Sequence, residues 1–322
     1  MPLLDVRELH VVFDTYLGRA HAVRDLSFSV EAGETIAIVG ESGCGKSVTA
    51  LSLMRLIPSP PGKIIGGEIW FEGEDLIKKS RREMRRIRGR KMGMIFQDPM
   101  TSLNPTMRIG AQIAEGLRLP KAQAQARCIE LLEMVEISNP EQRLEQYPHE
   151  LSGGQRQRVN IAIALACNPK LLIADEPTTA LDVTIQAQIL ELLKNIQEKM
   201  GTTIILITHD LGIVAGNCDR MLVMYGGKIV EQGSVQTIFR SSAHPYTRGL
   251  LQSVPRLDMN RTKSLEPIPG TPPNLLNPPQ GCPFWARCNR AMRICAEKNP
   301  PLVAISDKQT AACWENDHAS SS

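Results

Sequence analysis

The chain has 322 residues, which is enough for one large domain with additions or for two domains. Its 42% hydrophobic and 22% charged residues are ordinary for a globular protein. A net charge of +3 is too small to indicate a nucleic-acid partner, and no apolar run approaches the ~20 residues of a membrane-spanning helix. Because the N-terminus lacks the basic and then apolar pattern of a signal peptide, we expect the chain to stay in the cytoplasm.

The first informative stretch is an apolar strand followed by a glycine-rich loop. The uninterrupted run Thr35–Val39 is typical of a strand that is buried on both faces. The loop after it matches the pattern G-x-x-x-x-G-K-[ST], in which backbone N–H groups turn onto phosphates, the lysine reaches the outer phosphates and the last hydroxyl binds Mg²⁺. We expect a helix to begin near Gly45 and to add its positive end. The loop residues are Gly40, Glu41, Ser42, Gly43, Cys44, Gly45, Lys46 and Ser47.

A second strand and then a long helical stretch follow. The apolar run Met92–Phe96 predicts a strand that ends at Gln97. From about residue 98 to residue 160, strand-like runs disappear and helix-forming residues dominate, as in Ala111–Leu117 and Lys121–Val135. We therefore expect a mainly helical subdomain, inserted between the phosphate loop and the next strand.

The end of this helical stretch carries a glycine motif. Glycines at a helix N-terminus expose N–H groups and the positive end of the helix dipole, so they offer a second phosphate-binding surface. The motif residues are Ser152, Gly153, Gly154 and Gln155. We call them the signature.

A pair of acids ends the next buried strand, Leu171–Ala174. Two adjacent carboxylates are costly there unless a cation or a substrate uses them. Because side chains alternate along a strand, Asp175 and Glu176 suit two tasks: Asp175 would hold Mg²⁺, and Glu176 would polarise the water that attacks the γ-phosphorus. An amphipathic helix over Ile185–Ile196 and a strand at Thr203–Ile207 complete a crossover unit of an α/β fold.

The phosphate loop, the signature and the acid pair, in this order, resemble the ATP-binding subunits of ABC transporters over roughly residues 1–240. The resemblance implies an α/β P-loop NTPase core of ABC type with an inserted helical subdomain and a small C-terminal metal-binding extension. We expect the first part of the nucleotide-binding core at 1–97, the helical subdomain at 98–160, the second part of the core at 161–240 and the extension at 241–322.

The same resemblance assigns roles to single residues. His209, after the strand Thr203–Ile207, matches the switch histidine that contacts the γ-phosphate. Gln97 matches the glutamine that senses Mg²⁺ and the attacking water, and Asp182 matches the residue that couples two sites across a dimer. Tyr16 resembles the aromatic residue that stacks on adenine, with Phe13 as the competitor. The implied catalytic residues are Glu176, His209 and Gln97, and the implied Mg²⁺ ligands are Ser47, Gln97 and Asp175.

The position of the signature predicts a pair of subunits. A surface on a separate subdomain cannot easily fold onto the Lys46 site of its own chain. The family's arrangement is head to tail, so that each signature caps the nucleotide of the other subunit. Binding of ATP would then drive closure, and hydrolysis would relax it.

Two further stretches narrow the family. The sequences Gln97–Pro105 and His244–Leu251 resemble the ATPases of dipeptide, oligopeptide and nickel importers, and a dipeptide transporter ATPase most of all. The implied function is an ATPase that powers peptide import, with nickel or another small solute as the alternative cargo. A soluble ABC ATPase of DNA repair or translation is disfavoured, because the chain has one cassette and no sustained heptad run.

The resemblance also implies partners and a location. The partners would be a second, paralogous ATPase subunit, two permease subunits and, indirectly, an extracytoplasmic peptide-binding protein, with no nucleic acid. The chain would be a peripheral protein at the cytoplasmic face of the cell (inner) membrane.

A cysteine-bearing tail follows a stretch with seven prolines between residues 255 and 279, which predicts a linker because proline lacks an N–H and has a fixed φ. The tail cysteines are Cys282, Cys288, Cys295 and Cys313. A reducing compartment disfavours disulfides, whereas four thiolates suit Zn²⁺ or an iron–sulfur cluster. Without a tight C-x2–4-C pair the gaps suit a larger inorganic core, and the resemblance implies a [4Fe-4S] cluster, with Zn²⁺ and bare thiols as alternatives. The metal is expected to stabilise the fold of the tail. The alternative is that the tail senses the redox state and regulates ATPase activity.

Overall fold

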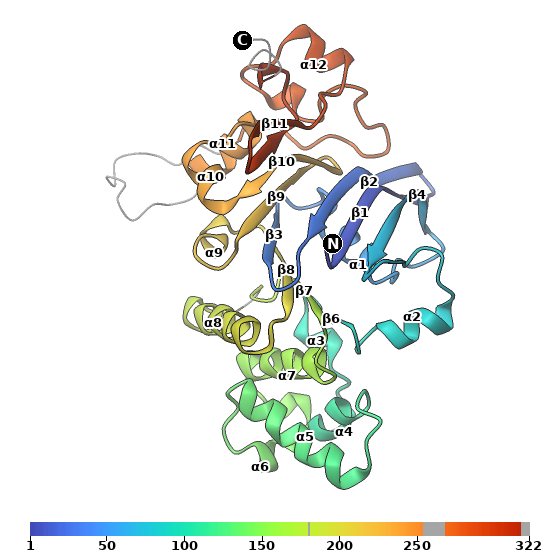
Figure 1. The fold of residues 1–322 in the computed structure, drawn as a ribbon, viewed down its shortest axis with the longest axis vertical. Coiled ribbons are helices and arrows are strands. Elements are labelled where there is room, and N and C mark those ends of the chain that lie inside the picture. The colour runs from blue at the N-terminus through green and yellow to red at the C-terminus, as the bar shows by residue number, and fades with distance from the viewer. Residues whose placement is uncertain (180, 254–267, 317–322) are drawn as a thin grey trace. The chain divides into compact units, whose positions relative to one another are not determined.

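The computed structural model describes residues 1–179, 181–253 and 268–316, which belong to two compact units (Figure 1). Unit 1 consists of residues 1–30, 36–77 and the described part of 208–322, and unit 2 consists of 31–35 and the described part of 78–207. Across the described ranges, every helix is too short or too polar to cross a bilayer.

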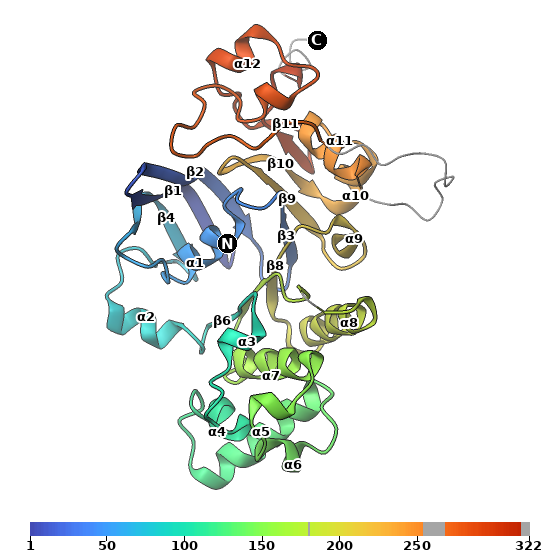
Figure 2. The ribbon, with the colours of Figure 1, turned by 180° about the vertical axis from the view of Figure 1, so that it is seen from behind.

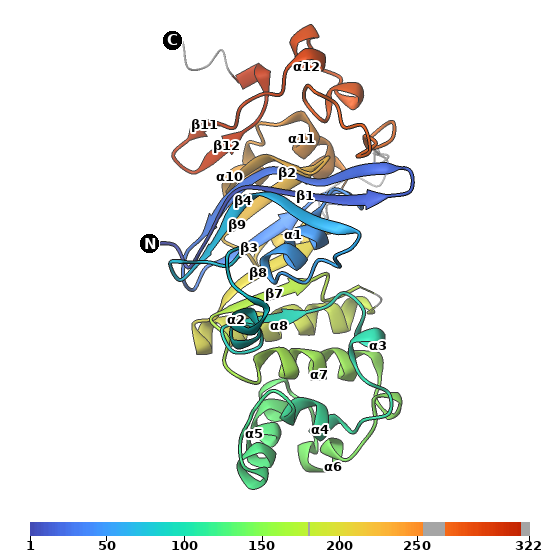
Figure 3. The ribbon, with the colours of Figure 1, turned by 90° about the vertical axis from the view of Figure 1, so that its right-hand side faces the viewer.

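Unit 1 begins with a four-stranded antiparallel sheet in the order β2-β1-β4-β5, and Figure 3 shows the β1–β2 hairpin along its length. Its strands are β1 (Leu4–Thr15), β2 (Gly18–Val30), β4 (Gly62–Phe71) and β5 (Glu74–Asp75). One face of β1 is buried through Leu4, Val6, Leu9 and Val11. The sequence analysis did not predict this sheet.

A second set of strands in unit 1 carries the phosphate loop. The order is β11-β12-β10-β9-β3, with β3 and β9 parallel and the other neighbours antiparallel. The strands are β3 (Thr35–Val39), β9 (Arg220–Tyr225), β10 (Lys228–Ser234), β11 (Val303–Ser306) and β12 (Gln309–Ala311). β3 has the residues that its apolar run predicted, and four of its five residues are buried.

The helices of unit 1 lie mostly in its C-terminal half. They are α1 (Lys46–Leu53), α9 (Leu211–Val214), α10 (Val235–Arg240), α11 (Pro245–Gln252), the 3-10 turn η2 (Trp285–Arg287) and α12 (Arg293–Glu297). Val39 at the end of β3 shares one hydrophobic cluster with Tyr225, with Tyr246 of α11 and with Phe284 of the tail. The C-terminal extension therefore packs into the core that supports the phosphate loop. Residues 255–267 of the predicted linker lie outside the described residues, and 268–279 form no helix or strand.

Unit 2 contains three parallel strands in the order β8-β7-β6, with the bounds β6 (Met92–Ile95), β7 (Leu171–Asp175) and β8 (Thr203–Thr208). Every residue of these strands is buried, which explains why uninterrupted apolar runs predicted them. Between β7 and β8 lies α8 (Val183–Met200), which buries Ile189, Leu192, Leu193 and Ile196. The predicted strand–helix–strand unit is confirmed, and α2 (Arg81–Ile87) precedes β6.

The predicted helical stretch is also confirmed, because residues 98–160 contain helices and no strand. The helices are α3 (Pro99–Ser102), α4 (Ile109–Ala114), α5 (Lys121–Met134), α6 (Pro140–Leu144), the 3-10 turn η1 (Pro148–Glu150) and α7 (Gly153–Leu165). α7 packs against α3, α4, α5 and β6, as Figure 2 shows. α4 begins and ends slightly before the predicted run Ala111–Leu117. The four-part domain division stays a prediction.

Candidate functional site

The glycine-rich loop joins β3 to α1 in unit 1 and depends on two glycines. Gly40 has a φ of +151°, and a Cβ there would lie 2.2 Å from the carbonyl oxygen of Met224. Gly45 has a φ of +106°, and a Cβ there would lie 2.5 Å from the carbonyl oxygen of Ala22. Any other residue at either position would combine a strained backbone with a steric clash, so the loop needs both glycines.

The lysine of the loop is folded back over it. Lys46 is 5% exposed, and its Nζ donates to the carbonyl oxygens of Gly40, at 2.8 Å, and of Glu41, at 3.1 Å. α1 begins at Lys46, as predicted, so Ser47 lies in the first helical turn and is half-buried. A hydroxyl oxygen at this place is a hard ligand of the kind that Mg²⁺ accepts.

The acid pair at the end of β7 lies in unit 2. Glu176 has a φ of +47°, and its N–H donates to the carbonyl oxygen of Ile207 at 2.9 Å. Its Oε2 accepts hydrogen bonds from Nε2 of Gln97 and Oγ1 of Thr179, both at 2.9 Å. Asp175, one residue earlier, is 5% exposed. The structure thus brings the predicted Gln97 to the predicted Glu176 and adds Thr179, which the sequence analysis missed although it lies only three residues along the chain.

The signature forms the N-terminus of α7, as predicted. The Ser152 hydroxyl accepts the Gln155 N–H at 3.3 Å, and the Gln155 side chain accepts the Ser152 N–H at 3.1 Å. Ser152 and Gly153 are exposed, and a Cβ at Gly153 would meet Leu181 at an ordinary 3.8 Å. The capping box fixes the first turn of α7 while its end remains at the surface of unit 2.

Asp182 follows Leu181 and is exposed. It is the N-cap of α8, where its Oδ1 accepts the Ile185 N–H at 3.0 Å. A carboxylate is a preferred cap for the first turn of a helix. The geometry therefore shows that Asp182 caps α8. The predicted coupling of two sites across a dimer stays a prediction.

The other predicted nucleotide contacts lie in unit 1. His209 directly follows β8 and is exposed. Tyr16 is 96% exposed at the turn between β1 and β2, whereas Phe13 is half-buried within β1. Of these two aromatic residues, Tyr16 offers the free ring face that stacking on a base requires.

All four cysteines of the tail line one small cavity of about 20 Å³. Cys282 and Cys295 are buried, and the N–H of Cys282 donates to the Cys295 carbonyl oxygen at 2.8 Å. Burial raises the pKa of the Cys282 thiol to about 12. Over residues 1–179, 181–253 and 268–316, however, no three His, Cys, Asp or Glu side chains are arranged as a metal-binding group. The predicted metal site is therefore not confirmed.

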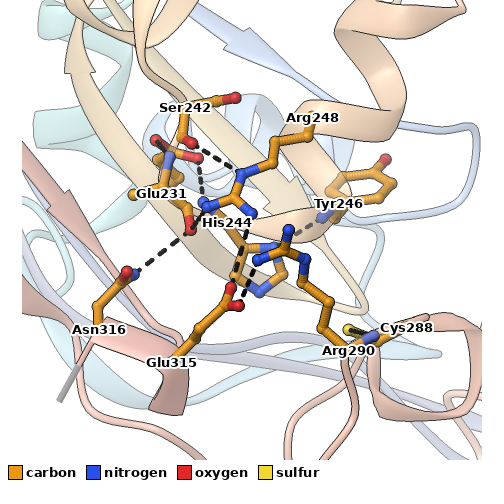
Figure 4. A network of polar contacts seen from close by, with 10 residues as sticks. Glu231, Ser242, His244, Tyr246, Arg248, Cys288, Arg290, Glu315 and Asn316 are labelled. Carbon is orange, nitrogen blue, oxygen red and sulfur yellow. Dashed lines mark hydrogen bonds and ion pairs between the residues drawn. The ribbon is translucent and has the colours of Figure 1, made fainter. Parts of the chain in front are cut away.

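Within unit 1, the motif that begins at His244 contacts β10 through hydrogen bonds to Glu231 (Figure 4). Glu231 of β10 is fully buried, and its carboxylate accepts the N–H groups of Ala243 at 2.7 Å and of His244 at 3.0 Å. It also accepts Nε2 of Gln309 of β12 at 2.6 Å. Burial lowers the pKa of His244 to about 3, so the ring is neutral, and its Nδ1 accepts the Tyr246 N–H at 3.1 Å.

A phosphate loop between a buried parallel strand and a helix, together with an acid pair at the end of another buried strand, defines a nucleoside triphosphatase of the P-loop class. Residues 23–179 match the family described as ABC transporter, and residues 230–295 match the family described as oligopeptide/dipeptide transporter, C-terminal region.

The relatives are similar over nearly the whole chain. The sequence is 57% identical to the oligopeptide transport ATP-binding protein OppD of Bacillus subtilis (strain 168), over 97% of this chain and 88% of that protein. It is 54% identical to the dipeptide transport ATP-binding protein DppD of the same organism, over 98% of this chain and 95% of that protein. A solved dimer of the ATP-binding cassette MJ0796 in a post-hydrolysis state, bound to ADP and Pi, matches with a TM-score of 0.65 and 27% identity, over 72% of this chain and 98% of that one.

The chain therefore belongs to the ATP-binding subunits of the ABC transporter family and has their P-loop α/β fold. It is an ABC ATPase whose extension matches the oligopeptide/dipeptide C-terminal region. The family resemblance drawn from the motifs is confirmed.

Proposed function

We propose that the chain is the ATPase subunit that powers the import of dipeptides or oligopeptides by a membrane ABC transporter. The observation that carries this proposal is the identity of 57% and 54%, over nearly the full chain, to ATP-binding proteins of oligopeptide and dipeptide transport. These relatives favour peptides over the nickel cargo that the sequence alone left open.

In this proposal the phosphate loop binds ATP. Lys46 exchanges the carbonyl oxygens of Gly40 and Glu41 for the outer phosphates, which satisfy its ammonium group better because they carry charge. Ser47 and Asp175 would supply hard oxygen ligands for Mg²⁺, and the bound cation would offset the charge of the phosphates.

Glu176 polarises the attacking water. Its hydrogen bonds to Gln97 and Thr179 fix the carboxylate, and the Gln97 amide is suited to orient the same water and to sense Mg²⁺. His209 contacts the γ-phosphate, and the exposed ring of Tyr16 stacks on adenine.

The second ATPase subunit completes the chemistry. We assign the signature residues 152–155 to capping of the nucleotide held by that subunit, and Asp182 to coupling of the two sites. The exposure of Ser152 and Gly153 at the end of α7 supports this assignment, as does the dimeric state of the MJ0796 cassette. ATP then acts as the ligand that favours the closed pair.

The remaining partners are two permease subunits that form the path through the membrane and an extracytoplasmic peptide-binding protein that delivers cargo. The second ATPase is a paralogue of this chain. The pair works at the cytoplasmic face of the membrane, where ATP is available.

Uptake by intact cells tests the cargo. In cells that lack this chain, a plasmid-borne copy is expected to restore uptake of a labelled dipeptide or oligopeptide, while Lys46→Ala reduces it at least about tenfold because a charge-assisted contact to phosphate is lost. Lys194→Ala, on an exposed position of α8, is the matched control and should transport normally. Peptide uptake that persists without the chain, together with a loss of nickel uptake, would make the cargo assignment wrong.

We further propose that the four tail cysteines hold a metal group, for which the family resemblance favours a [4Fe-4S] cluster over Zn²⁺. The support is that all four thiols line one cavity and that two of them are buried. A cavity of about 20 Å³ has room for roughly one water-sized body, so a single ion would fit as it stands, whereas a cluster would require the thiols to move apart. When bound, the group would supply folding energy to a tail with a small core.

Metal analysis of the full chain, purified without oxygen, decides the occupant. We expect about four iron atoms and matching acid-labile sulfide per chain, and a brown colour. Cys288→Ser should lose the metal, whereas Cys167→Ser, outside the tail, should keep it. A result of one zinc ion per chain would show a zinc site in place of the cluster. Metal-free protein with an ordered tail would contradict the proposal.

A further inference from the structure

Arg287 of the C-terminal extension contacts the phosphate loop directly, 246 residues away in the sequence. Its Nη1 donates to Oε2 of Glu41 at 2.6 Å, and its Nη2 donates to Oε1 of Glu41 at 3.0 Å. The Arg287 side chain is 6% exposed and that of Glu41 is 26% exposed. A two-point ion pair of this kind fixes both position and orientation, and partial burial protects it from screening by salt.

The remaining donors of Arg287 are also used. Nη1 donates to the Tyr225 hydroxyl at 3.0 Å, Nη2 to the Ile268 carbonyl oxygen at 3.0 Å and Nε to the Pro269 carbonyl oxygen at 2.8 Å. A guanidinium group has five N–H donors, and here five acceptors meet them. The group also lies over the rings of Tyr225 and Phe284, at 5.7 and 5.9 Å from their centroids. Arg287 is therefore held in one orientation before any nucleotide binds.

The backbone of Glu41 is held as well. Its N–H donates to the hydroxyl of Tyr246 at 2.9 Å, and its carbonyl oxygen accepts from Lys46. Tyr246 is fully buried in α11 and packs against the ring of Tyr225, with the centroids 4.5 Å apart. The side chain of Glu41 and its N–H are thus held by Arg287 and Tyr246, which both lie after β8 in the chain.

The charge of Glu41 makes this arrangement significant. A carboxylate within a loop that binds a polyphosphate repels its ligand, and the repulsion is large where water is partly excluded. The hydrogen bonds to Glu41 raise the pKa of Arg287 above its ordinary value, so the guanidinium stays charged. The pair therefore places a permanent cation against the one acidic side chain of residues 40–47.

We propose that Arg287 is a positioning residue for ATP binding, which neutralises the Glu41 carboxylate and holds it against the extension. The C-terminal extension is then a part of the nucleotide site. This assignment rests on the phosphate loop alone and depends neither on the cargo nor on a metal in the tail.

A purely structural role for Arg287 predicts a different result. If Arg287 only attached the tail, its loss would lower the thermal stability and leave nucleotide affinity unchanged. If it acts through the charge of Glu41, its loss weakens ATP binding, and removal of the Glu41 charge restores binding without restoring the ion pair.

The test titrates the purified full-length chain with a fluorescent ATP analogue and Mg²⁺, and records thermal unfolding of each variant. Arg287→Gln is expected to weaken binding about tenfold, as for the loss of a charge-assisted contact. The double variant Glu41→Gln/Arg287→Gln is expected to regain most of the affinity. Arg293→Gln is the matched control, because this tail arginine is 93% exposed and pairs with Glu297 within α12.

Two results would overturn the proposal: an Arg287→Gln protein that binds the analogue as tightly as the unchanged chain, or a double variant that binds as weakly as Arg287→Gln. Should Arg287→Gln fail to fold, Arg287→Lys carries the test, since lysine keeps the charge but not the two-point geometry. Its affinity is expected to stay within about threefold of the unchanged chain, and a loss as large as tenfold would contradict action through charge.

Discussion

Replacement of Glu176 by glutamine is expected to lower ATP turnover of the assembled transporter by about 10²–10⁴-fold, because the amide cannot accept the proton of the attacking water. Binding of ATP should be retained. Glutamine has the shape of glutamate, and its side-chain oxygen can still accept the Gln97 or Thr179 hydrogen bond. The backbone bond from residue 176 to Ile207 does not involve the side chain.

The measurement is steady-state phosphate release beside equilibrium binding of ATP. Glu191→Gln is the matched control, since it makes the same change at an exposed position of α8 and should leave turnover unchanged. Turnover of Glu176→Gln near the level of the unchanged chain would remove the catalytic role assigned to this residue. A parallel loss of ATP affinity would instead point to a role in binding.

The sequence predicted the strands that are buried on both faces. The runs that became β3, β6, β7 and β8 are apolar without interruption, because both sides of each strand face the interior. Such a run identifies a buried strand without information about the neighbouring strands. The amphipathic α8 was predicted for a related reason, since its buried residues follow the helical period.

The antiparallel sheet of unit 1 was missed because its signal is broken. β1 buries Leu4 and Val6 in alternation, but Glu8 has a φ of +46° and the register shifts between Val6 and Leu9. The bulge moves the buried positions by one residue, so the second half of the strand no longer continues the period of the first. The strand is defined by its pairing with β2 and β4, which the local sequence pattern does not show.

In the candidate site, too, local features were predicted and contacts between distant segments were not. For a contiguous motif, such as the phosphate loop or the signature, the structure confirms the predicted helix starts, and the chemical roles of the residues stay predictions. Contacts between distant segments were not predicted, because a single sequence does not show which residues meet. Arg287 is the clearest example: nothing near it distinguishes it from Arg290 or Arg293, and only its burial against Glu41 does.

A substitution in the signature is the second change for which we expect a large effect on ATP turnover. Gly153→Asp is expected to reduce ATP turnover of the assembled ATPase pair by roughly 10²-fold or more, because like charges about 4 Å apart near a protein surface repel by ~4 kcal/mol. The single chain should fold normally. A side chain at this position meets Leu181 at 3.8 Å, and an acid in the first turn of α7 interacts favourably with the helix dipole.

The decisive comparison is between turnover of the pair and ATP affinity of the chain alone. If the signature caps the nucleotide of the other subunit, the added carboxylate meets phosphate only in the closed pair, so the affinity of the single chain stays unchanged. Gly116→Asp is the matched control, because it adds the same charge to an exposed glycine of unit 2 that has open space around it. Equal losses of single-chain affinity and of turnover in Gly153→Asp would show that the signature acts on its own nucleotide, and capping by a partner would then be wrong.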